Sequence, residues 1–230
     1  MSRYVFVVLA TAAVCAGIAR PAAAQQTLNL NIGYFAVRGE DSRIDDDVLL
    51  ANLDVLSFEV SDFNNLTIGA EYLAGLGEYL EAGVGASFYT RTVPTVYRDL
   101  LRGDGTEIEQ ELKLRIIPLT GTIRVLPLGH SNPVQPYVGG GVALYNWRYV
   151  ETGDFVDLSD LIFNETFEAT GHDVGPVFLA GIRGVSSQFV IGGEFRFQMG
   201  NGHVGTENGF FTDRIDLGGY TAQATIGVRF

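Results

Sequence analysis

The sequence predicts an all-β fold, an eight-stranded antiparallel up-and-down barrel that crosses a membrane. Three observations lead to this prediction: short segments alternate between apolar and polar side chains, long and short connections follow each other in turn, and acidic residues gather in the long connections. A period of two is the pattern of a strand with one apolar and one polar face. About ten tilted residues of such a strand suffice to cross a bilayer.

The last eleven residues show the alternation most clearly. One parity carries every polar group, and the other is wholly apolar. The apolar parity consists of Tyr220, Ala222, Ala224, Ile226, Val228 and Phe230. A helix would spread these side chains around its whole circumference, so the segment is predicted to be a strand with one side facing lipid.

The N-terminal residues predict export of the chain. Arg3 precedes an uncharged run over residues 5–19, and the alanines at 22–24 have the small-residue form of a cleavage site. We predict a cleaved signal peptide over 1–24 and one barrel domain over 25–230. Cys15, the only cysteine, falls in the signal peptide, so no disulfide or cysteine-based metal site is expected in the mature chain.

Taken in order along the chain, eight alternating segments are separated by seven connections. The strands are predicted at 28–36, 66–74, 80–88, 111–126, 136–149, 175–185, 189–199 and 220–230. Long connections are predicted at 39–64, 91–110, 150–174 and 200–216, and short ones at 75–78, 127–135 and 186–188. Because long and short connections alternate, the strands form an antiparallel meander, and closure into a barrel removes the open edges that a bilayer does not tolerate.

The alternation differs in quality from strand to strand. It is regular in the second and third strands and in the seventh, where Phe189, Ile191 and Phe195 share one parity, whereas Phe35 and Val37 blur the end of the first strand. In the fourth strand the apolar parity changes beyond Pro118. A β-bulge at Ile117 and Pro118 is predicted there, because one extra residue exchanges the two faces of a strand. In the fifth and sixth strands the pattern does not show which parity faces outward and which faces inward.

The polar parity predicts the contents of the lumen. Periodicity alone does not separate a membrane barrel from a secreted eight-stranded barrel with an apolar core. The polar parity is nevertheless mostly uncharged, and its few charges nearly balance, which suits a narrow interior better than a water-facing exterior. We predict a lumen charge network of Glu71, Glu81, Arg124, Glu194, Arg196 and Arg229. Glu194 and Arg196 lie on one face, and a structural plug is favoured over a gated polar path.

Charged and aromatic residues are also unevenly placed. The four long connections hold 22 of the 27 acidic residues and five arginines, a balance of −17. This acidic balance excludes a basic nucleic-acid footprint, so no nucleic acid is expected as a partner. Aromatic residues at the strand ends predict two interfacial girdles. One comprises Tyr72, Tyr79, Tyr137, Phe189 and Phe230 at the short turns, and the other Tyr89, Tyr145, Trp147, Tyr149 and Phe197 at the long connections.

Four features together carry a resemblance: the signal peptide, the Gly-Gly-Glu-Phe-Arg-Phe strand at 192–197, the Pro-Tyr-Val-Gly-Gly-Gly-Val segment at 136–142 and the final Val-Arg-Phe. The mature chain resembles the small bacterial outer-membrane β-barrels, a group that includes OmpA transmembrane domains, OmpX, OmpW and opacity proteins. The resemblance implies a location in the cell outer membrane. It also implies a C-terminal assembly signal, in which the outer-membrane assembly machinery recognises Tyr220, Ile226, Val228 and Phe230. Fold-level likeness does not settle the role.

Two classes of function stay open. The first is a non-enzymatic envelope or surface protein that acts through long acidic extracellular loops. The second is a narrow porin-like channel for passive uptake of small solutes, hydrophobic ones included, as the resemblance to OmpW implies. In the second case Leu49, Leu50, Leu53 and Phe163 are expected to line an entry funnel.

The acidic run Asp41, Asp45, Asp46 and Asp47 is the candidate cation site of the sequence. It lacks the spacing and the central glycine of a calcium-binding loop, so a solvated surface loop is the favoured interpretation. Whether the run binds a divalent cation stays open.

The three histidines are the remaining candidates for a catalytic or metal site. His172 stands beside Asp173, His203 lies in the last long connection and His130 lies in a short turn, but no serine accompanies them in a hydrolase-type motif. We expect no enzyme activity, no catalytic residue, no metal site and no cofactor. The expected partners are outer-membrane lipid, lipopolysaccharide and the assembly machinery, and the expected state is a monomer.

Overall fold

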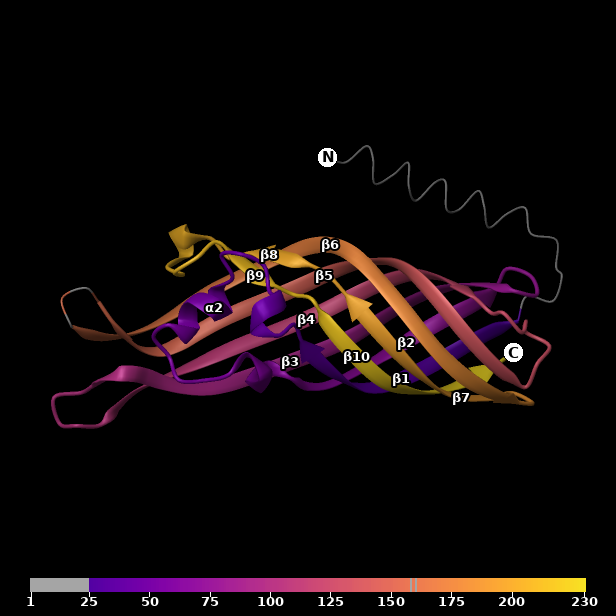
Figure 1. Ribbon diagram of the computed structural model, residues 1–230, viewed down its shortest axis with the longest axis horizontal. Coiled ribbons are helices and arrows are strands. Elements are labelled where there is room, and N and C mark those ends of the chain that lie inside the picture. Colours follow the sequence, from indigo (N-terminus) through magenta and orange to yellow (C-terminus); the bar gives the residue numbers. More distant parts are fainter. Residues whose placement is uncertain (1–24, 158, 160) are drawn as a thin grey trace.

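The computed structural model describes residues 25–157, 159 and 161–230, so the predicted signal peptide over 1–24 lies outside the described residues. Eight strands form a closed antiparallel barrel in the order β1-β10-β7-β6-β5-β4-β3-β2 (Figure 1). Their bounds are β1 (Gln26–Val37), β2 (Asn65–Gly75), β3 (Leu80–Leu101), β4 (Glu107–Val125), β5 (Val134–Val156), β6 (Ile162–Ser186), β7 (Phe189–Gln198) and β10 (Gly219–Arg229). The predicted eight-stranded up-and-down barrel is therefore confirmed.

The other elements lie in the first and the last long connection. They are the 3-10 helix η1 (Glu40–Ser42), the helix α2 (Val48–Leu53) and the 3-10 helix η2 (Val60–Phe63), followed near the C-terminus by β8 (Asn201–His203), η3 (Thr206–Asn208) and β9 (Arg214–Asp216). Figure 1 shows α2, β8 and β9 toward one end of the molecule, which we call the loop end; the C-terminus lies at the opposite, turn end. Among the described residues, no helix has the length and apolar character needed to span a bilayer.

An apolar belt covers the outside of the barrel on the side of the turn end. Over about ten residues of each strand the outward side chains are apolar, and many are large and exposed. The belt includes Leu30, Ile32, Ile68, Val84, Leu119, Ile123, Val142, Phe178, Ile182, Ile191, Phe195 and Ile226. Leu30 and Ile226 expose 66% and 64% of their surface. Soluble monomers rarely expose so large an apolar patch, so the belt is the surface that contacts lipid.

Two hairpins continue far beyond the belt toward the loop end (Figure 1). β3 and β4 stay paired as far as Leu101 and Glu107, and β5 and β6 as far as Val156 and Ile162. β4 also pairs with β5 in this region, so the hairpins form one four-stranded sheet, which we call the extension. Much of the polar sequence predicted as connections at 91–110 and 150–174 is therefore strand, because a strand face in water has the composition of a loop.

The fourth strand of the barrel contains no bulge. The register of β4 with β5 runs without a shift through Ile117 and Pro118, so the predicted bulge is wrong. Odd-numbered residues of β4 point outward along its whole length, and even-numbered residues point inward and are buried. The outward residues from Ile117 to Val125 include Leu119 and Ile123, whereas those from Arg115 back to Glu107 are all charged. The change of parity marks the level at which β4 leaves the membrane.

Above that level the barrel is filled by a hydrophobic core. Tyr89, Tyr145, Trp147 and Tyr149 all point inward and are almost fully buried in this core. Their predicted place in an outer girdle is wrong, and Tyr137, predicted in the other girdle, is buried in the lumen. The outward aromatic residues at this level include Phe197 and Tyr220, whose rings stack with centroids 4.9 Å apart. An inward aromatic residue above the membrane and an outward one within it look alike in the sequence.

Candidate functional site

The lumen at the level of the belt contains a connected group of four charges. Arg124 on β4 donates from Nη2 to Glu71 Oε2 on β2 (2.5 Å) and to Glu194 Oε2 on β7 (2.8 Å). Arg196 donates from Nη2 to Glu194 Oε1 (2.8 Å), and its Nη2 lies 3.6 Å from Glu71 Oε1. Strand alternation points all four side chains inward, and the closed ring brings strands from opposite parts of the chain face to face. The four charges were all named from the sequence, and the structure brings them together.

A second group of charges lies nearer the turn end. Arg183 on β6 donates to both carboxylate oxygens of Glu81 on β3, at 3.0 and 2.9 Å, and to Gln135 Oε1 at 2.9 Å. Arg229 also donates to Gln135, at 3.1 Å, and is not within ion-pair distance of a carboxylate in the described part of the chain. The sequence did not indicate Arg183, because the sixth strand was not phased.

Tyr137 connects the two groups. Its ring lies under the guanidinium of Arg124, 4.8 Å from centroid to Cζ, and 5.8 Å from that of Arg183. Its hydroxyl donates to Glu194 Oε2 at 3.2 Å. Cation-aromatic contacts of this kind are favourable when they are shielded from water. The two groups therefore act as one layer of side chains across the lumen, with Glu71, Glu81 and Glu194 facing Arg124, Arg183 and Arg196.

This layer closes the lumen. The cavity above it, lined by residues that include Phe35, Tyr89, Ile116 and Arg196, has a volume of about 20 Å³. A cavity needs roughly 10–15 Å³ to hold one water molecule, so this space admits little more than that. An eight-stranded interior is only wide enough for its own side chains, and here they fill it.

The first long connection forms a second closure, at the mouth of the barrel on the side of the loop end. Under the porin-like alternative, Leu49, Leu50, Leu53 and Phe163 were expected to line an entry funnel, and this expectation is wrong. Leu49 is fully buried in the core, and Leu50 and Leu53 of α2 pack against it. Phe163 lies at the tip of the β5–β6 hairpin instead, where its ring stacks on Phe155. The apolar residues of this connection therefore plug the mouth and do not line an opening.

One buried aspartate holds the plug in place. Asp47 accepts from Arg43 Nε and Nη2, both at 2.9 Å, and from Leu49 N at 2.9 Å, which caps the N-terminus of α2. It also accepts from Asp216 N on β9 at 2.6 Å. The interpretation of residues 41–47 as a solvated loop is wrong for Asp47, although Asp41, Asp45 and Asp46 are exposed. Asp47 latches the first long connection to the last.

A buried carboxyl group fixes the other side of α2. Glu151 on β5 accepts from Asn52 Nδ2 at 2.6 Å and from the Tyr149 hydroxyl at 2.9 Å. The residue lies in the extension, outside the belt, and is only 3% exposed. No arginine or lysine of the described residues lies within ion-pair distance of it. Burial is the main cause that raises the pKa of Glu151 above its ordinary value.

We expect the docking of α2 to weaken as the pH rises above the ordinary pKa of a glutamate. Because the pKa of Glu151 is raised when α2 is docked, its contribution is fully present below the ordinary pKa and is lost as the pH rises through the raised value. The substitution Glu151→Gln keeps the shape of the neutral acid and should flatten this dependence. Hydrogen exchange of the α2 amides, corrected for intrinsic rates, measures it, and an equal slope in both proteins would contradict the assignment.

The predicted C-terminal signal residues lie on the outer surface. Tyr220, Ile226, Val228 and Phe230 are all exposed, and the first three alternate along β10 with inward residues. β10 pairs with β1 on one side and β7 on the other, so it is the strand whose pairing with β1 closes the ring. The structure thus places the four side chains together on the face that contacts lipid.

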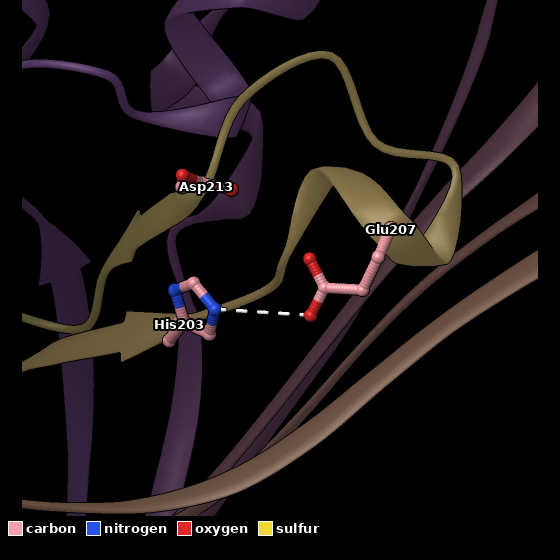
Figure 2. Close-up of side chains that lie close together, drawn as sticks. All are labelled: His203, Glu207 and Asp213. Atoms are coloured by element: carbon pink, nitrogen blue, oxygen red, sulfur yellow. Dashed lines mark ion pairs between the residues drawn. The ribbon is translucent and has the colours of Figure 1, made fainter.

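The histidines are scattered, and the described residues record no hydrogen bond between a histidine and a serine. His172 points outward, 3.4 Å from Asn146 Nδ2, whereas Asp173 points inward and accepts from Asn201 N. Figure 2 shows His203 beside Glu207 and Asp213 in the β8–β9 hairpin, with His203 Nε2 3.9 Å from Glu207 Oε1. All three side chains are exposed, and Asp213 already accepts from Thr206 N. Such an open group is more typical of a solvated loop than of a metal site.

Comparison with solved structures finds the same architecture in small outer-membrane barrels. The outer membrane protein OprG from Pseudomonas aeruginosa has 10% sequence identity and a TM-score of 0.53, with 90% of this chain and 96% of that chain covered. Neisserial surface protein A has 11% identity and a TM-score of 0.44, with 89% and 95% covered. Outer membrane protein W of E. coli has 16% identity and a TM-score of 0.40, with 92% and 100% covered.

No protein-family model and no curated protein matches the chain. Similarity at about 10% identity shows the fold and carries no role over. The belt, however, is a property of this chain itself, and it requires lipid around the barrel. The closed ring of eight strands and its lipid-facing belt make this chain an integral membrane β-barrel with the fold of the small outer-membrane proteins.

Proposed function

We propose that this chain is a non-enzymatic surface protein of the outer membrane, which acts through its extension and its loops rather than through its lumen. One observation carries the proposal: the lumen is closed twice, whereas four strands project beyond the membrane. The paired charges around Arg124 form the lower closure, and the plug with Leu49 forms the upper one. With both closures in place, the lumen offers no continuous path for a solute.

One edge of the extension is hydrogen-bonded to a loop, and the other is not paired. The edge of β3 is covered, because Ser57 N donates to Val96 O and Arg98 N donates to Val55 O, both at 2.9 Å. β6 pairs with β7 only as far as Val177, and no strand of the described residues pairs with its outer edge between Ile162 and Thr170. Unpaired backbone groups at a sheet edge can bind an extended segment of another chain. The open edge of β6 is the surface proposed to meet an extracellular partner.

The charge distribution supports this orientation. The four long connections and the tips of the extension carry most of the acidic residues of the chain. Long connections of such barrels face the exterior, and short turns face the periplasm. The acidic loop end is therefore proposed to face outward, where its charge favours basic partners over nucleic acid or acidic surfaces.

Two partners of the barrel itself are part of the proposal. The assembly machinery is proposed to bind the exposed face of Tyr220, Ile226, Val228 and Phe230 before the ring closes, since all four side chains are accessible on β10 and at its end. Lipopolysaccharide and the other lipids of the membrane are proposed to surround the belt. A monomer is proposed because the ring leaves no strand edge open within the membrane.

Bilayer recordings test the proposal against the alternative of a narrow porin-like channel. The wild-type protein, reconstituted in planar bilayers, is expected to give no unitary conductance and no flux of small solutes. The matched variant Glu194→Gln removes one lumen charge and keeps the side-chain shape. Discrete openings in the wild type that this variant abolishes would establish a polar path and overturn the proposal.

A further inference from the structure

Three basic side chains stand together on the outer wall, immediately above the belt. Arg115 and Lys113 lie on β4 and Arg148 on β5, all with outward parity. Arg115 is the Cα partner of Arg148 across the two strands, and Lys113 lies one outward position further up β4. Lys113 is the only lysine of the chain. The group therefore concentrates positive charge in a protein whose net charge is −12.

The protein neutralises the group only in part, because Glu168 and Glu111 are the two carboxylates beside three cations. Like charges directly opposite each other on a sheet are destabilising. Arg148 donates from Nη2 to Glu168 Oε2 at 2.6 Å, but both side chains are 41% exposed, which makes this a surface pair of small energy. The Nε atoms of Arg115 and Arg148 are buried and have no hydrogen-bond partner among the described residues. Glu111 is the nearest other outward carboxylate on β4, beyond Lys113.

Two grooves meet at this place. The upper groove has a volume of about 550 Å³ and is lined by residues that include Phe88, Thr90, the carboxylate Glu111 and the three basic side chains. The lower groove, of about 490 Å³, lies within the belt and is lined mainly by Leu30, Ile68, Ala86, Phe88 and Ile117. Phe88 lines both grooves, so a basic groove above the membrane surface continues into an apolar groove below it.

We propose that these two grooves bind one phosphorylated, acylated lipid of the leaflet on the side of the loop end, an inference that rests on the orientation proposed above. Its phosphate would be held by Lys113, Arg115 and Arg148, and one acyl chain would lie in the groove beside Ala86. Arginine suits this role because its guanidinium matches the geometry of a phosphate group and makes two parallel hydrogen bonds. A free phosphate would leave the apolar groove unused, and a soluble protein would not reach a groove within the membrane.

Lipid binding to the purified protein tests the proposal directly. The probe is diphosphoryl lipid A, titrated into the full chain in neutral detergent and counted by native mass spectrometry. The variant K113Q/R115Q removes two cations, and the matched control R98Q/R102Q removes two cations from the far part of the extension. We expect the first variant to bind lipid A at least tenfold more weakly, because the loss of one charge-assisted contact alone corresponds to about that factor and the variant removes two. The control is expected to bind as the wild type does.

The variant Ala86→Leu tests the second groove without changing any charge. The leucine side chain fills the apolar groove and is itself compatible with lipid, so the variant is expected to bind lipid A more weakly. Inorganic phosphate is expected not to compete with lipid A for the wild-type protein. Folding of every variant is checked by heat-dependent gel mobility. Wild-type affinity in K113Q/R115Q or in Ala86→Leu, equal loss in the control, or competition by inorganic phosphate at millimolar concentration would each overturn the proposal.

Discussion

Replacing Arg124 with alanine is expected to lower the free energy of unfolding by about 3–5 kcal/mol. Arg124 is 1% exposed and pairs with both Glu71 and Glu194 at short distance. Its removal leaves two carboxylates buried side by side, with Arg196 as the remaining cation within ion-pair distance among the described residues. A buried charge without its partner costs far more than the pair itself contributes. Urea titration of the protein in lipid vesicles, followed by gel mobility, measures the loss.

The control for this prediction is Arg102→Ala. Arg102 pairs with Asp154 near the end of the extension, but its side chain is 36% exposed, so its loss should cost at most about 1 kcal/mol. A quadruple variant, Arg124→Met and Arg196→Met with Glu71→Gln and Glu194→Gln, removes the four charges together and should regain most of the stability. If Arg124→Ala and Arg102→Ala cost the same, the lumen charges do not hold the barrel together.

Replacing Asp47 with asparagine is expected to release the plug from the mouth of the barrel. Asparagine still caps α2, so the change isolates the charge that pairs with Arg43. Arg43 is 8% exposed, and loss of its partner should weaken docking by about 3–5 kcal/mol. Trypsin should then cut after Arg43, and the emission of Trp147, the only tryptophan, should shift to longer wavelength.

Asp45→Asn is the matched control for the plug, because Asp45 is exposed and only two residues away. It should leave both the cleavage pattern and the emission unchanged. Trp147 reports on docking because it lies in the same hydrophobic core as Val48 and Leu49 of α2. A protected Arg43 in Asp47→Asn would show that the hydrophobic packing of α2 suffices without the latch.

The sequence predicts the fold well wherever a strand stays in one environment. β10 lies wholly within the belt, so one parity faces lipid from Tyr220 to Val228 and the pattern is regular. β4 crosses from lipid into water, so its outward parity is apolar on one side of Pro118 and polar on the other. No local pattern separates that change of solvent from a bulge.

The candidate site shows the same limit. Glu194 and Arg196 were found because their neighbours on β7 alternate cleanly. Arg183 was missed because β6 carries apolar residues on both faces nearby: Leu179 is buried in the interior, whereas Phe178 faces lipid. Asp47 was placed in a solvated loop because its partners, Arg43 and the β9 backbone, come together only through the fold. Pairing across the chain is not a local property.

The uninterrupted ladder between β5 and β6 has a mechanical consequence. From Val134 to Val156 every residue of β5 is paired in one register, from the turn end to the tip. No hinge separates the projecting part from the embedded ring, so the tip is held at a fixed height of roughly 30 Å above the lipid surface. A force applied by a ligand bound at the tip would act along the strands and load these hydrogen bonds in shear. The force would therefore reach the barrel wall directly, because no flexible segment lies between the tip and the wall.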